Sequence, residues 1–176
     1  ELYIVYAADP DRLPASDGLD DANIYLIRSI DGGVTWQPRV RINDDATTSD
    51  QILPWIDVKP GGTIDVAWFD RRNDPADQSW DIYLARSTDG GQSFLPNVQI
   101  NDTSFTTPAG GTWMGEYLAL AVDNDHAYVS WTSSITDGNG DVYFDKAPNA
   151  QIPEPASLAL LAAGALSLLR KRRRRA

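Results

Sequence analysis

Parts of the chain repeat at a fixed spacing, and a fixed repeat length restricts the architecture more than any single motif does. The sequence Asn-Ile-Tyr-Leu at residues 23–26 recurs as Asp-Ile-Tyr-Leu at residues 81–84. At the same offset, residues 29–36 recur as 87–94, and residues 41–44 recur as 99–102. A third, partial copy includes residues 141–144, which follow residues 81–84 at nearly the same spacing. The chain is therefore expected to contain one structural unit several times.

Each unit alternates apolar and polar residues over short segments bounded by turn sequences, which is typical of β-strands. In the complete unit we expect strands at about residues 52–58, 63–69, 81–86 and 94–100. The turns between them contain Pro60-Gly61-Gly62, Asn73-Asp74-Pro75 and Asp89-Gly90-Gly91. Four antiparallel strands in roughly 40 to 60 residues are typical of one β-propeller blade.

On this basis residues 1–147 are expected to be all-β, forming a partial β-propeller of about two and a half four-stranded antiparallel blades. The first blade would hold strands two to four, the second would be complete at about residues 51–101, and the last would hold strands one to three. A parallel β-helix and a β-sandwich are the alternatives. Because residues 2–7 at the start of the chain already resemble a strand, we expect a C-terminal fragment of a longer protein. Open strand edges at both ends predict aggregation when the fragment is expressed alone.

Ser-Ile-Asp-Gly-Gly-Val-Thr-Trp at residues 29–36, with its variant at residues 87–94, resembles the Asp-box, or BNR repeat, of sialidase-like propellers. The resemblance implies a structural hairpin between strands three and four, on the face away from the ligand. Its glycines are expected at positive φ, its acidic and hydroxyl side chains should bond the turn backbone, and its aromatic residue should pack between sheets. The Asp-box residues are Ser29, Asp31, Gly32, Gly33, Thr35, Trp36, Ser87, Asp89, Gly90, Gly91, Ser93 and Phe94.

Ligands of such a propeller would meet the opposite face, which is formed by the loops between strands two and three and by interblade loops at residues 47–51 and 105–115. Adjacent arginines there could clamp a carboxylate, although we favour a loop held by its own ion pairs. The candidate residues of this ligand face are Asp70, Arg71, Arg72, Asn73, Asp74, Trp113 and Glu116.

No catalytic residue is assigned, although Arg71, Arg72, Glu116 and Tyr117 are candidates. Glu116 beside Tyr117 resembles the carboxylate-activated tyrosine of sialidases, but neighbours on one strand point to opposite faces. The Arg-Ile-Pro motif of that family is missing, because Asn43 follows Ile42. We therefore expect no enzyme in this chain alone. A sialidase-type glycoside hydrolase with its site in further N-terminal blades is the alternative, and a structural matrix protein is a third hypothesis.

Asp137, Asn139 and Asp141 have the alternating spacing of a calcium loop. No bidentate glutamate follows them, so a glycine-rich hairpin without metal is favoured and no cofactor is expected. His126 is expected at the surface, and the chain has no cysteine for a disulfide or thiolate site. Residues 1–151 carry 9 basic and 24 acidic side chains, a balance that argues against nucleic-acid binding.

The tail, residues 152–176, follows a short linker at residues 148–151. It contains Pro-Glu-Pro, then a segment of fourteen residues rich in alanine and leucine (156–169), then a basic cluster. Fourteen apolar residues are short for a spanning helix, which needs about 20, and the basic cluster should stay cytoplasmic. The sorting-signal residues are Pro153, Glu154, Pro155, Arg170, Lys171, Arg172, Arg173, Arg174 and Arg175.

The order of these three parts resembles the PEP-CTERM sorting signal. The resemblance implies recognition by an exosortase at the inner membrane, transient anchoring by the C-terminal hydrophobic helix, and delivery to the cell surface or extracellular matrix of a Gram-negative-type bacterium. The expected function is an exported propeller module that binds a glycan or exopolysaccharide, or that mediates an interaction.

Overall fold

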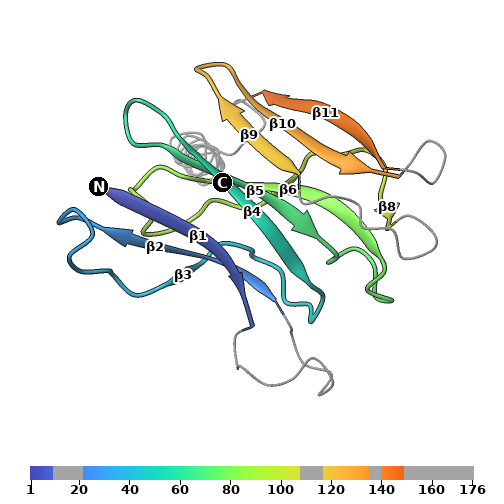
Figure 1. Cartoon of the computed structure of the whole chain (residues 1–176), viewed down its shortest axis with the longest axis horizontal. Helices are drawn as coiled ribbons and strands as arrows, with labels where there is room; N and C mark the ends of the chain where they lie inside the picture. Colours follow the sequence, from blue (N-terminus) through green and yellow to red (C-terminus); the bar gives the residue numbers. More distant parts are fainter. Residues whose placement is uncertain (10–21, 108–116, 135–139, 149–176) are drawn as a thin grey trace, which may run out of the picture.

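The computed structural model describes residues 1–9, 22–107, 117–134 and 140–148, which form three antiparallel sheets and no helix (Figure 1). The first sheet contains β1 (Leu2–Ala8), β2 (Asn23–Ser29) and β3 (Val40–Arg41). The middle sheet contains β4 (Gln51–Val58), β5 (Ile64–Asp70), β6 (Ser79–Ser87) and β7 (Val98–Gln99), and β8 (Phe105–Thr106) also pairs with β6. The third sheet contains β9 (Leu118–Val122), β10 (His126–Ser133) and β11 (Asp141–Pro148).

The predicted all-β class is confirmed, and the three sheets contain three, five and three strands in chain order. The predicted length of one strand is wrong. A strand was expected over residues 94–100, but β7 has only 2 residues. Leu95 donates its backbone N–H to Arg86, but Pro96 has no N–H to continue the ladder. The short strand β8 was not predicted.

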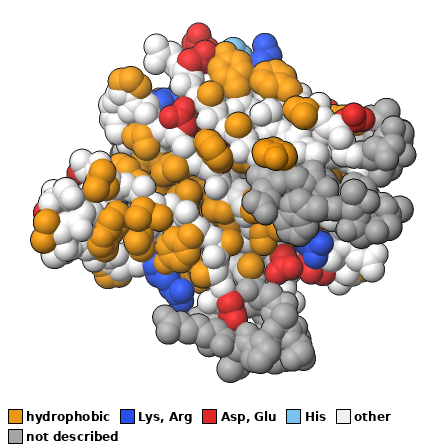
Figure 2. Space-filling model, in the orientation of Figure 1, with side chains coloured by type: hydrophobic (Ala, Val, Ile, Leu, Met, Phe, Trp, Pro, Cys, Tyr) orange, Lys and Arg blue, Asp and Glu red, His pale blue; other side chains and the backbone are white. Residues whose placement is uncertain are grey.

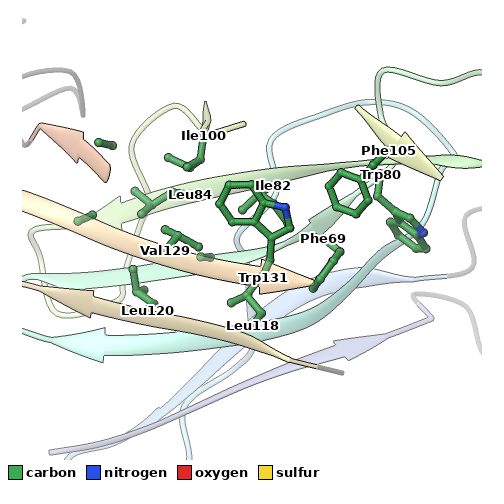
Figure 3. Close-up of a cluster of buried hydrophobic side chains, with 13 residues drawn as sticks. Phe69, Trp80, Ile82, Leu84, Ile100, Phe105, Leu118, Leu120, Val129 and Trp131 are labelled. Carbon is green, nitrogen blue, oxygen red and sulfur yellow. The ribbon is translucent and has the colours of Figure 1, made fainter. Parts of the chain in front are cut away.

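Each sheet has two faces, which we call face A and face B. On the middle sheet, face A carries Ile64, Val66 and Trp68 and packs against the first sheet, whose contributions include Ile24 and Leu26. Face B of the middle sheet packs against the third sheet (Figure 3), and the facing residues in this second cluster include Phe69, Ile82, Leu84, Leu118, Leu120, Val129 and Trp131. The middle sheet is therefore buried on both faces.

One aromatic pair recurs on face A of all three sheets. Tyr6 lies directly opposite Tyr25 across β1 and β2, with ring centroids 5.9 Å apart. Trp68 and Tyr83 are paired in the same way at 6.3 Å across β5 and β6. Trp131 and Tyr143 repeat the arrangement at 6.3 Å across β10 and β11. Directly opposed aromatic side chains stabilise a strand pair, so these contacts fix the same register in each unit.

Face B of the middle sheet also carries a buried ion pair. Asp65 and Arg86 lie opposite each other on β5 and β6, and both are at most 1% exposed. Nε of Arg86 donates to Oδ1 of Asp65 at 2.7 Å, and Nη2 donates to Oδ2 at 2.9 Å. This two-point geometry compensates the cost of burying both charges.

The predicted tail lies outside the described residues, and so do the linker beyond residue 148 and the expected apolar helix. Within the described part of the chain, no helix has the length and apolar character needed to cross a bilayer.

Candidate functional site

The first Asp-box forms the turn after β2, and its side chains hold the backbone of that turn. The Ser29 hydroxyl donates to the Asp31 carboxylate at 2.7 Å and accepts the Gly33 N–H at 2.8 Å. The Thr35 backbone N–H donates to the same carboxylate at 2.9 Å. Gly32 and Gly33 have φ of 75° and 93°, which residues with a Cβ rarely adopt. The predicted turn bonds and positive φ angles are therefore present.

The second Asp-box repeats this arrangement after β6 and also contacts the first sheet. Ser87 donates to Asp89 at 2.8 Å, and the Ser93 N–H donates to Asp89 at 3.0 Å. A Cβ on Gly91 would lie 3.0 Å from a methyl carbon of Leu26, so this position combines a positive φ with a close approach. The turn thus contributes to the packing of the first sheet on the middle sheet.

The aromatic residues that end the two Asp-boxes differ in environment. Phe94 packs against the cluster between the first and middle sheets, as predicted. Trp36 does not pack between sheets, because its side chain is 38% exposed. Phe94 lies on the face A side of the middle sheet, and the corresponding side of the first sheet has no further sheet against it within the described residues.

Hydrogen bonds hold the pKa of Asp31 at about 2, foremost those from the Thr35 hydroxyl and backbone and then that from Ser29, because they stabilise the charged carboxylate. A folded-state pKa below the unfolded value of about 3.9 gives stabilisation that is complete above that pH and is lost as the pH falls toward the folded pKa. Replacing Thr35 with valine should therefore raise the Asp31 pKa toward its ordinary value. NMR titration of the Asp31 carboxyl carbon in both chains tests this, and an unchanged midpoint in the variant contradicts it.

A second side-chain clamp follows β3 and β7 at equivalent repeat positions. Asn43 accepts the Ile24 N–H at 3.0 Å and donates to Asn23 at 2.7 Å. One repeat later, Asn101 accepts the Ile82 N–H at 2.7 Å and donates to the Asp81 side chain at 2.9 Å. This clamp explains the repeated Ile-Asn-Asp sequence, to which no role could be assigned from the sequence alone.

The Arg72 guanidinium forms hydrogen bonds and ion pairs within the fold. Its guanidinium donates to Asp70 at 2.8 and 3.0 Å, to Asp44 at 2.6 Å and to Asn97 at 2.9 Å. Its Cζ lies 4.1 Å from the centroid of the Tyr83 ring. Since Asp44 follows the first sheet and Asn97 precedes β7, Arg72 joins the first and middle sheets.

Arg71 lies on the other side of the middle sheet. Its Cζ is 3.7 Å from the centroid of Trp80, a member of the face B cluster. Its Nη1 donates to Asp77 at 2.9 Å and is 3.7 Å from the carboxylate of Asp50. Arg71 and Arg72 therefore point apart, and the two cannot clamp one carboxylate together. Ion pairs within and around the loop, the interpretation we favoured, are present.

Two hydrogen-bond donors beside Arg71 are buried without a hydrogen-bond partner. They are Nε of Arg71 itself and Nε1 of Trp80. Buried donors in proteins are nearly always paired, so an unpaired set needs an explanation. Asp77, which accepts a hydrogen bond from Arg71, is also strained, because its φ of 53° is unfavourable for a residue with a side chain. We call Arg71, Asp77 and Trp80 the Arg71 corner.

The other candidates from the same loop serve the local structure. Asn73 donates to Asp81 at 2.8 Å and to the Tyr83 hydroxyl at 3.0 Å. Asp74 accepts the backbone N–H groups of Ala76 at 2.9 Å and Ser79 at 2.8 Å, and these bonds lower its pKa.

A groove of about 220 Å³ lies along the third sheet. Small residues of β9 and β10 contribute to its floor, and the exposed side chains of Trp55, Tyr117 and Val142 border it. The Thr132 hydroxyl beside it is buried without a partner. The complete lining is Trp55, Tyr117, Leu118, Ala119, Ser130, Trp131, Thr132 and Val142.

Several predicted residues lie outside the described part of the chain, so their roles stay predictions. These are Trp113, Glu116, Asp137, Asn139 and the sorting-signal residues. Tyr117 is described and 77% exposed, and Asp141 is exposed at the start of β11. Within the described residues, acidic and histidine side chains form no group of three or more that could hold a metal ion.

The tail matches the model of a known sequence motif. The model of the PEP-CTERM protein-sorting motif matches residues 151–175. No curated protein and no solved structure matches the chain. The match confirms the sorting signal predicted from Pro-Glu-Pro, the apolar segment and the basic cluster. The chain is thus an exported bacterial protein that is held at the membrane, cleaved, and sorted by an exosortase to the cell surface.

Proposed function

We propose that the sheets of this chain form part of a β-propeller of the Asp-box type, displayed at the surface of a Gram-negative-type bacterium, which binds a glycan at the Arg71 corner. Residues 1–147 would form the propeller blades, and residues 152–176 would be the sorting segment that exosortase removes.

The stacking of the three sheets supports the propeller. Equivalent strands occur in the same order in each sheet, and equivalent turns follow β2 and β6. The aromatic pairs give each sheet the same register. Repeated four-stranded sheets packed face to face are how propeller blades bury their apolar surfaces.

The Arg71 corner carries the proposal of ligand binding, because its two unpaired N–H donors require acceptors. Sugar hydroxyl and carboxylate oxygens are suitable acceptors for a guanidinium and an indole N–H. The corner lies at the end of the sheet opposite the Asp-box turns, where β5 ends and β6 begins. A β-bulge in β4, with Leu53 at a φ of 54°, lies at the same end, and such bulges are frequent beside binding sites.

Replacing Arg71 with alanine is expected to weaken glycan binding about 10- to 100-fold, because a charge-assisted hydrogen bond and a stacked cation are lost. Arg71→Lys should restore only part of the affinity, because lysine keeps the charge but lacks Nε and the planar group. Binding is measured by calorimetry with oligosaccharides selected on a glycan array.

Two further arginine variants serve as controls. Arg41→Ala removes the same charge from a side chain that is 37% exposed and should leave affinity unchanged. Arg72→Ala should instead lower the free energy of unfolding, by about 2–4 kcal/mol, because Asp70 loses its buried partner. Equal affinity of the Arg71→Ala and unaltered chains for every glycan bound would contradict the proposed site.

A further inference from the structure

Face B of the third sheet carries apolar side chains that are buried at the equivalent positions of the middle sheet. Val142 occupies the repeat position of Ile82 and is 81% exposed, whereas Ile82 is 0% exposed. Phe144 occupies the position of Leu84 and is 63% exposed, whereas Leu84 is 0% exposed. The sequence thus places core residues on a face that no described sheet covers.

Face A of the first sheet shows the same contrast. Aligned through the aromatic pairs, Leu2 and Ile4 occupy the positions of Ile64 and Val66. Leu2 is 47% exposed and Ile4 is 45% exposed, whereas both residues of the middle sheet are fully buried. Figure 2 shows hydrophobic side chains at the surface over the first sheet, at the left of the view, and over the third sheet, at the top.

The two contacts between sheets follow one rule. Face B of the first sheet, with Ile24 and Leu26, packs on face A of the middle sheet, with Trp68. Face B of the middle sheet, with Ile82, packs on face A of the third sheet, with Trp131. A face B therefore meets a face A at each contact, and the two uncovered faces are one of each kind.

We propose that these uncovered faces bind each other between two copies of the chain, so that face B of the third sheet in one copy packs on face A of the first sheet in the next. The contact continues the interface already present twice within the chain, with the same residue positions on both sides. Phe144 and Val142 would cover Leu2 and Ile4 as Leu84 and Ile82 cover their partners.

The groove along the third sheet fits this arrangement. The groove lies on face B, where Ser130, Thr132 and Val142 point. The Trp131–Tyr143 pair lies at the same end of the sheet, on face A. On the middle sheet the equivalent surface packs with Trp131, the face A aromatic residue of the next sheet (Figure 3). In the proposed contact, the aromatic residue at that position is Tyr6 of the second copy.

The contact is head to tail, because different faces of the two copies meet. Such a contact leaves one open face at each end of a pair, so association continues until a ring closes or an open series forms. The inference rests on the stacking proposed for the propeller but not on the Arg71 corner. A monomeric chain that still binds glycans through Arg71 would therefore refute this inference alone.

Two variants disable one face each. Val142→Lys with Phe144→Lys places charges on face B, and Leu2→Glu with Ile4→Glu places charges on face A. The chain, residues 1–176, is purified in a nonionic detergent, and its mass is followed by sedimentation velocity over a concentration series. We expect the unaltered chain to associate and each variant alone to be monomeric, with Kd raised at least about a hundredfold by the burial of unpaired charge.

The mixture of the two variants gives the sharpest result. Each keeps one intact face, and the two intact faces are complementary, so the mixture should form a dimer of one copy of each and nothing larger. A control variant, Val34→Lys in the exposed first Asp-box turn, should associate like the unaltered chain. Circular dichroism and the unfolding midpoint show that each variant is folded.

Three outcomes would overturn the proposal. One is an unaltered chain that stays monomeric throughout the series, as it would if the tail covered these faces. Another is a single variant that still dimerises through its intact face, since that indicates contact between like faces. The third is a mixture of folded variants that remains monomeric.

Discussion

Replacing Asp65 with alanine is expected to lower the free energy of unfolding by about 3–5 kcal/mol, because it leaves the charge of Arg86 buried beside an apolar cluster. Arg86 is 1% exposed and its guanidinium is bonded at two points to the lost carboxylate. Nζ of Lys59 lies 3.8 Å from Oδ2 of Asp65. Lysine is also a cation, so it cannot neutralise Arg86 once the carboxylate is removed. Denaturant titration followed by tryptophan fluorescence measures the change.

The partner variants separate the charge effect from a general loss of packing. Asp65→Leu combined with Arg86→Met removes both charges and should recover most of the lost stability, since apolar replacement of a buried ion pair is often neutral. Arg41→Ala breaks an exposed ion pair with Asp45 and should cost less than about 1 kcal/mol. A loss below about 1 kcal/mol for Asp65→Ala would show that Arg86 is not buried as described.

Replacing Trp68 with alanine is the second change with a large expected effect, a loss of about 3–5 kcal/mol in the free energy of unfolding. The indole is 0% exposed and stacks on Tyr83, and its Nε1 donates to the buried carboxylate of Asp70 at 2.7 Å. The substitution therefore opens a cavity between two sheets and removes a donor from a buried acid. Thermal and chemical unfolding both report the loss.

Trp36→Ala is the matched control for this prediction. Trp36 ends the first Asp-box and is partly exposed, so its truncation should cost at most about 1.5 kcal/mol. Equal losses for the two tryptophans would contradict the packing of the middle sheet between its neighbours.

Much of the fold could be predicted from the sequence, because it depends on local signals. The alternation of apolar residues and the turn residues located the long strands, and the constant repeat offset grouped them into equivalent sheets. The length of β7 and the presence of β8 could not be predicted in this way. Both depend on a few hydrogen bonds to β6 from residues far along the chain.

The site could be predicted less well, because adjacent residues in the sequence have different partners in space. Arg71 and Arg72 look equivalent in the sequence, yet one packs on Trp80 and the other on Tyr83, in different apolar clusters. The pairing of Asp65 with Arg86 requires the register of two strands, which no motif reveals. The asparagine clamp at residues 43 and 101 was accessible, since the repeat itself marked both positions.

The repeated units form sheets that stack face B on face A, and the proposed propeller rests on this stacking. A crystal structure of residues 1–176 tests the stacking most directly. We expect Ile82 and Leu84 to lie beneath Val129 and Trp131 of the third sheet, and Trp68 to lie beneath the first sheet. A sandwich in which the repeats merge into two sheets, or repeats without contact through these faces, would contradict it.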